Sequence, residues 1–202
     1  MNAGVNEFGN QLFDDSLEEP DRRTLDIDLR HVLDTLKLAI YYMRNDKRGQ
    51  SGGSVVMTAS LAGYLASAGA SVYSAAKHGV VGLLRALKGD CAKLGIGISV
   101  VAPAITLTNL VEGRQSGEDL EAWGKRMKSL GVPINTAEEV ARTVVWLIGQ
   151  GVKASGMGIL IQGGKCADVE AGIAKSRGTW MGKEMLDLFR GGRNAPLFPN
   201  KL

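Results

Sequence analysis

A tyrosine and a lysine four positions apart, Tyr73 and Lys77, form the sequence pattern best suited to catalysis. On a helix, residues at this spacing lie one turn apart on the same face. An ammonium group beside a phenol favours the phenolate, so we expect Lys77 to lower the pKa of Tyr73 from its ordinary value of about 10. A tyrosine tuned in this way can act as a general acid and base near neutral pH. The same spacing also arises by chance in a chain with four tyrosines, so its context has to support it.

Ser60 supplies part of that context. It ends the apolar, β-branched stretch SVVMTAS (54–60), which predicts a buried strand, and it opens a turn that contains Gly63. Sites in parallel α/β sheets form at the carboxyl ends of strands, and the helix that carries Tyr73 begins shortly afterwards. A hydroxyl group at this place can hydrogen-bond a substrate oxygen and share a proton with Tyr73. The alternative is a serine that only caps a turn or a helix.

The elements around these residues alternate between strands and helices. Thr136 and Glu139 have the spacing of a capping box, which marks the start of the last helix. The predicted strands cover residues 54–60, 98–103 and 158–164, and the predicted helices cover residues 25–44, 71–94, 120–130 and 136–149. Because the strands are continuously apolar, we expect an α/β fold with a parallel sheet covered on both faces. We expect the tail, residues 165–202, to be rich in loops.

The composition excludes several classes of protein. Apolar residues make up 45% and charged residues 22% of the 202 positions, as in globular rather than disordered proteins. A net charge of +3 and an aromatic content of 5% do not predict a nucleic-acid surface. We find no secretory signal and no apolar run long enough for a membrane span. The two cysteines and two histidines are too scattered to predict a metal site or a disulfide framework, and the expected location is the cytoplasm.

Six short motifs, taken in order and with their spacing, resemble the short-chain dehydrogenase/reductase family. These motifs are Asn2–Ala3–Gly4, the strand that ends at Ser60, Tyr73-SAA-Lys77, VVAPAITLT (100–108), TAEEVA (136–141) and SGMGILIQGG (155–164). The tail segment GTWMGKEMLDLFRGG (178–192) is similar to the C-terminal extension of fungal members related to prostaglandin-dehydrogenase-like enzymes. The resemblance implies a Rossmann-like, doubly wound parallel sheet over residues 1–164, followed by a C-terminal extension over residues 165–202.

The resemblance also implies hydride transfer between NAD or NADP and a secondary alcohol or ketone. Tyr73 would exchange the proton of the substrate oxygen, Lys77 would assist it and hydrogen-bond the nicotinamide ribose, and Ser60 would polarise the substrate oxygen. Two sets of residues would line the cofactor: Asn2, Ala3 and Gly4 on the adenosine side, and Pro103, Thr106 and Thr108 at the nicotinamide end. Residues 109–131 would form the variable substrate loop, and helices 71–94 and 136–149 would join copies in a homo-oligomer.

The chain departs from the family pattern in two places. The family's catalytic asparagine corresponds to Asp28, where a carboxylate near Lys77 would alter the titration of the tyrosine–lysine pair. The family's first β-α units, with their glycine-rich phosphate loop, have no counterpart. The pattern Gly149-x-Gly151-x-x-Ala154 follows a helix instead of a strand, which is the wrong context for binding a pyrophosphate. We therefore expect a partial Rossmann-like sheet without its first β-α units, with strand 54–60 at an exposed edge.

Three hypotheses account for the missing units. In the first, the chain is the C-terminal part of a dehydrogenase whose start lies upstream of Met1, and an in-frame glycine-rich segment precedes it. In the second, a short enzyme uses Tyr73 and Ser60 to isomerise, dehydrate or cyclise a substrate without nicotinamide. In the third, an inactive binding subunit associates with a full-length relative, and its function survives the substitution Tyr73→Phe.

Overall fold

A four-stranded sheet forms the centre of the computed structural model, which describes residues 1–7, 11–44, 52–65, 67, 69–111 and 118–192. The strand order is β1 (Gly53–Thr58), β2 (Ile96–Pro103), β5 (Gly158–Gln162) and β6 (Lys165–Asp168). Strands β1, β2 and β5 run parallel, and β6 runs antiparallel to β5. The three strands predicted from apolar runs are therefore confirmed, to within two residues at each end.

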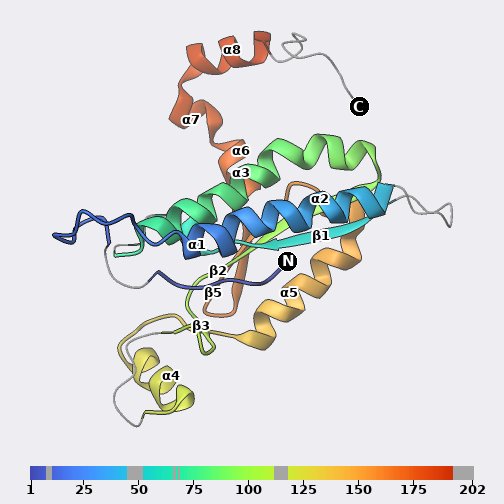
Figure 1. Ribbon diagram of the computed structural model, residues 1–202. Coiled ribbons are helices and arrows are strands. Elements are labelled where there is room, and N and C mark those ends of the chain that lie inside the picture. The colour runs from blue at the N-terminus through green and yellow to red at the C-terminus, as the bar shows by residue number, and fades with distance from the viewer. Residues whose placement is uncertain (8–10, 45–51, 66, 68, 112–117, 193–202) are drawn as a thin grey trace.

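Helices cover both faces of this sheet (Figure 1). The helices α2 (His31–Arg44) and α3 (Ser71–Lys93) lie on one face, and α5 (Ala137–Gln150) lies on the other. Each face has its own apolar core: Leu84 belongs to the core under α2 and α3, and Leu147 to the core under α5. Since neighbouring residues of β1 point into opposite cores, its three buried residues, Val55, Val56 and Met57, are all apolar. The predicted partial Rossmann-like α/β fold is confirmed.

Local signals place the starts of several helices where the sequence predicts them. Thr136 Oγ1 accepts a hydrogen bond from the Glu139 amide at 3.2 Å, and Glu139 Oε2 accepts one from the Thr136 amide at 2.7 Å. This reciprocal pair is the predicted capping box of α5. Helix α4 (Leu120–Ser129), which follows the N-cap residue Asp119, confirms the predicted amphipathic helix.

The predicted helix 25–44 contains an interruption near its start. A short helix, α1 (Arg23–Leu25), runs into a π-helical turn over Asp26–Arg30 before α2 begins. Asp28 lies in this turn and is fully buried. Turns of this kind are rare and often occur at functional sites. Apolar periodicity does not distinguish such a turn from regular α-helix, so the sequence did not reveal it.

The tail is more regular than the loop-rich prediction, which is wrong for its described part. After β6, the chain forms α6 (Val169–Lys175), α7 (Arg177–Met181) and α8 (Lys183–Gly192). Glu170 on α6 accepts three hydrogen bonds from the Arg85 guanidinium on α3, at 2.7, 3.0 and 3.1 Å. The first part of the predicted extension therefore packs against the body of the fold.

The strand β1 lies at an edge of the sheet, as predicted. Met1 runs beside it: its amino group donates to the Val56 carbonyl at 2.9 Å, and its carbonyl accepts from the Thr58 amide at 3.1 Å. Beyond β2, a second small sheet pairs β3 (Thr106–Leu107) with β4 (Asn135–Thr136) in parallel. Among the described residues, no helix is both long and apolar enough to cross a membrane.

Candidate active site

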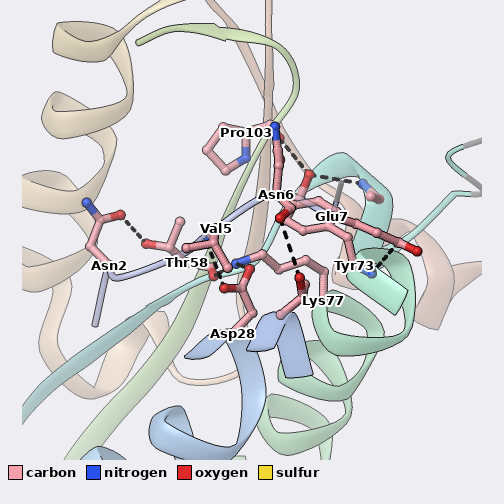
Figure 2. Close-up of polar contacts among 12 residues, drawn as sticks. Asn2, Val5, Asn6, Glu7, Asp28, Thr58, Tyr73, Lys77 and Pro103 are labelled. Carbon is pink, nitrogen blue, oxygen red and sulfur yellow. Dashed lines mark hydrogen bonds and ion pairs between the residues drawn. The ribbon is translucent and has the colours of Figure 1, made fainter. Parts of the chain in front are cut away.

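Tyr73 and Lys77 lie on the first two turns of α3, beside the carboxyl ends of β1 and β2 (Figure 2). The Lys77 Nζ is 5.3 Å from the centroid of the Tyr73 ring, so the predicted shared helix face is confirmed. Lys77 is only 3% exposed, and its Nζ donates to the Thr58 carbonyl at 3.4 Å. A lysine buried to this extent needs such partners, because an isolated ammonium is costly to remove from water.

Ser60 occupies the turn that follows β1 and meets Tyr73 there. Its Oγ donates to the Pro103 carbonyl at 3.3 Å and accepts from the Ala62 amide at 3.2 Å, which caps the short 3₁₀ turn Leu61–Gly63. Its side chain and that of Tyr73 line the same cavity. Ser60 therefore caps a turn and lines the cavity, and its role toward a substrate stays a prediction.

Asp28 forms a buried ion pair with Lys77. Its Oδ2 lies 3.0 Å from the Lys77 Nζ, and the two side chains are 0% and 4% exposed. Its Oδ1 accepts a hydrogen bond from the Val5 amide at 2.9 Å. The π-helical turn at Asp26–Arg30 brings this carboxylate to α3. The side chain of Asp28, and not only its main chain, is thus part of the site.

The pKa of Tyr73 is raised above its ordinary value, so the prediction of a lowered pKa is wrong. Burial of the phenol is the largest cause. The hydrogen bond with Ser60 lowers the pKa of Tyr73, and the negative charge of Asp28 raises it. Asp28 pairs with Lys77, and its negative charge opposes the effect on Tyr73 that was predicted for the lysine. The spacing of four residues identifies the neighbours of Tyr73 but not the sum of the charges around it.

One of the predicted cofactor residues, Gly4, lies against this ion pair, and a second, Asn2, contacts Thr58 at the end of β1. A Cβ added to Gly4 would be 3.5 Å from both the Lys77 Nζ and the Asp28 Oδ2, so the main chain passes directly over the pair. Asn2 Oδ1 accepts a hydrogen bond from Thr58 Oγ1 at 2.9 Å, which fixes the segment at the end of β1. The main chain near Gly4 therefore shapes the floor of the site.

Asn6 and Glu7 also contact the site, and the sequence analysis missed both. The Asn6 Nδ2 donates to the Leu110 carbonyl at 2.7 Å, and Glu7 accepts hydrogen bonds from the start of α3. These partners lie 104 and about 65 positions away along the chain, so no local spacing signals them.

A cavity of about 970 Å³ lies beside Tyr73, Lys77 and Ser60. It is lined by nine of the ten predicted site residues: Asn2, Gly4, Asp28, Ser60, Tyr73, Lys77, Pro103, Thr106 and Thr108. The tenth, Ala3, is exposed and outside its lining. The volume is in the upper range for small-molecule and cofactor sites. In the described part of the chain, no group of three or more histidine, cysteine or acidic side chains is placed to hold a metal ion.

Part of the predicted substrate loop lies at the same cavity. Leu110 and Val111 line it before the loop reaches residues 112–117, which are outside the described part of the chain. Trp123 on α4 lines the cavity too and is 5% exposed. Val140 on α5 adds an apolar side chain from the other face of the sheet. Tyr73 and Lys77 therefore lie beside a largely apolar space.

Known proteins match this chain in sequence and in fold. A family model described as short chain dehydrogenase matches residues 1–119. The "Short-chain dehydrogenase/reductase prx4" of Penicillium rubens is 33% identical over 209 residues, which cover 93% of this chain and 60% of that protein. The "Short-chain dehydrogenase/reductase ATR7" of Stachybotrys chlorohalonatus is 32% identical over 215 residues, covering 94% and 63%.

A solved structure extends this likeness to the fold. A 3-oxoacyl-[acyl-carrier protein] reductase from Brucella melitensis, in complex with NAD, superposes with a TM-score of 0.65 at 22% identity. The match covers 81% of this chain and 64% of that one. The chain spans about three fifths of the length of the curated relatives it matches. With a family model that matches more than half of its residues, the chain belongs to the short chain dehydrogenase family.

Proposed function

We propose that the chain forms the proton-transfer and substrate-binding part of an oxidoreductase that moves hydride between NAD or NADP and a secondary alcohol or ketone. The observation that carries this proposal is the meeting of Tyr73, Ser60 and Lys77 in one cavity at the carboxyl end of β1. Membership of the short chain dehydrogenase family supports the same class of reaction.

Tyr73 exchanges the proton of the substrate oxygen in this proposal. During oxidation it accepts the hydroxyl proton, and during reduction it donates a proton to the carbonyl oxygen. Ser60, which lines the same cavity as Tyr73, offers its hydroxyl to the oxyanion that develops on the substrate. Burial raises the pKa of Tyr73, so the phenol keeps its proton and can donate it to a carbonyl oxygen.

The residues present fit the nicotinamide end of a cofactor. An ammonium carries three donor hydrogens, and the Lys77 Nζ has Asp28 and the Thr58 carbonyl as partners at 3.0 and 3.4 Å, which leaves one donor for a ribose hydroxyl. Gly4 leaves room above this group, and Pro103 borders it on β2. When bound, the nicotinamide supplies or accepts the hydride. The Brucella protein, whose fold is similar, holds NAD.

The test is the consumption of NADH or NADPH by the 202-residue chain with a panel of aliphatic and cyclic ketones, followed by near-ultraviolet absorbance. Acid–base help of this kind contributes about 10²–10⁴-fold, so Tyr73→Phe is expected to reduce the rate by that factor. Tyr42→Phe is the matched control, because Tyr42 is 69% exposed on α2. Near-full activity of Tyr73→Phe would refute the proposal. Turnover without cofactor that is lost in Tyr73→Phe would instead support an isomerase, dehydratase or cyclase.

We also propose that copies of the chain associate through α3 and α5. Apolar side chains exposed on α5 support this, among them Val145, Trp146 and Ile148, which are 68%, 48% and 51% exposed. Exposed apolar patches of this kind often mark interaction sites. Light scattering after gel filtration tests it: Trp146→Glu is expected to shift the chain toward monomer, and a wild-type monomer at all concentrations would contradict it.

A further inference from the structure

The start of α3 lacks a cap from its own sequence. The first four amides of any helix have no partner within the helix and need acceptors from elsewhere. The residue at the N-cap position is Ala70, whose methyl group cannot accept a hydrogen bond, and the first turn contains no acidic residue. In contrast, α4 and α6 are capped by the side chains of their own N-cap residues, Asp119 and Asp168. The helix that carries Tyr73 therefore depends on another part of the chain.

The Glu7 carboxylate supplies the missing acceptor. Its Oε2 accepts hydrogen bonds from the Val72 amide at 2.8 Å and from the Tyr73 amide at 3.1 Å. Its Oε1 accepts one from Ser71 Oγ at 3.3 Å. Glu7 is 7% exposed, which is unusual for an acidic residue and requires partners of this kind. A carboxylate at a helix N-terminus also interacts favourably with the helix dipole.

We propose that Glu7 is a positioning residue for Tyr73: its carboxylate fixes the first turn of α3 and thereby holds the phenol against Ser60. This proposal rests on the proposed function only in that Tyr73 exchanges a proton there. The contacts of Glu7 do not depend on that function. Tyr73 is the third residue of α3, within the turn that would fray without a cap. Lys77 lies one turn deeper and has its own anchor in Asp28, so the loss of Glu7 affects the two side chains differently.

Glu7 also connects Tyr73 to the predicted cofactor segment. Residues 1–7 form one continuous segment that carries Asn2 and Gly4 at the end of β1 and Glu7 at the start of α3 (Figure 2). A group that binds along Asn2 and Gly4 and orders this segment would therefore also order the first turn of α3. By linkage, an intact Glu7 contact would strengthen the binding of that group.

The experiment compares Glu7→Ala with Asp168→Ala, which removes another carboxylate that accepts two backbone amides, those of Gly158 on β5 and Ala171 on α6. Amide hydrogen exchange and the NMR signal of isotope-labelled Tyr73, assigned with Tyr73→Phe, are measured on the full chain. In Glu7→Ala, we expect the Val72 and Tyr73 amides to lose about tenfold or more of their protection. We also expect the raised pKa of Tyr73 to move down toward its ordinary value as the phenol becomes hydrated. The Asp168→Ala variant is expected to change neither signal.

A second variant keeps the proposal falsifiable if Glu7→Ala does not fold. Glu7→Gln retains a carbonyl acceptor without the charge, so it should preserve the Tyr73 signal and lose only part of the amide protection. Unchanged exchange and an unchanged Tyr73 signal in folded Glu7→Ala would overturn the proposal, as would equal changes in Asp168→Ala. These readouts need no turnover, so inactivity of the chain would count against the proposed function and leave this inference intact.

Discussion

Replacing Asp28 with asparagine removes the charge that opposes Lys77 and leaves the shape of the site nearly unchanged. The Lys77 Nζ lies 5.3 Å from the centre of the Tyr73 ring, where an ammonium without an opposing charge favours the phenolate and lowers the pKa of the phenol. The Asp28 carboxylate, 3.0 Å from the same Nζ, offsets much of this interaction. We therefore expect Asp28→Asn to lower the pKa of Tyr73, because the negative charge that raises it is removed.

The assay for this prediction is the titration of labelled Tyr73 by NMR in the wild type and in Asp28→Asn. The exposed neighbour Asp26, paired with Arg30 on the same π-helical turn, provides the control Asp26→Asn, which should leave the titration unchanged. Asp28→Asn should also lower the free energy of unfolding by about 3 kcal/mol, because Lys77 remains buried without its counter-ion. An unchanged or higher pKa of Tyr73 in folded Asp28→Asn would refute the reasoning that the carboxylate offsets the lysine.

Two further predictions concern stability. Burial raises the pKa of both Tyr64 and Tyr73, so the folded state holds these two protons more tightly than the unfolded chain does. The resulting contribution to the free energy of unfolding is complete below about pH 10 and is lost as the pH rises further. Urea denaturation should show a free energy of unfolding that falls above pH 10, with a smaller slope for Tyr64→Phe. Arg85→Ala should cost about 2 to 3 kcal/mol in the same assay, because it leaves the buried Glu170 carboxylate without its partner. Arg142→Ala, which breaks an exposed pair, should cost less than about 1 kcal/mol.

The predictions that succeeded depend on contacts between residues close in sequence. The apolar run 54–60 had to be a buried strand wherever it lay in the sheet, and Thr136 and Glu139 bond to each other across three positions. The same is true of Tyr73 and Lys77, which share a helix face by geometry alone. Contacts between residues a few positions apart can be predicted because the local backbone conformation fixes the positions of both residues.

The features that were missed depend on distant partners. The π-helical turn that buries Asp28 shows no change in apolar periodicity, and the tail forms regular elements because β6 finds an edge on β5. Glu7 lies about 65 positions before the amides it caps. In each case, tertiary contacts stabilise a local structure for which the local sequence has no specific signal.

The pKa of Tyr73 depends on both local and distant contacts. A helix turn fixes the distance between the phenol and the nearest cation, but the charge that the phenol experiences is a sum over everything packed around it. Here that sum includes a carboxylate from a different helix and the loss of water on burial, both of which oppose the cation. A tyrosine–lysine pair therefore identifies where a proton can be exchanged, and the packing of distant segments, Asp28 foremost among them, decides at what pH.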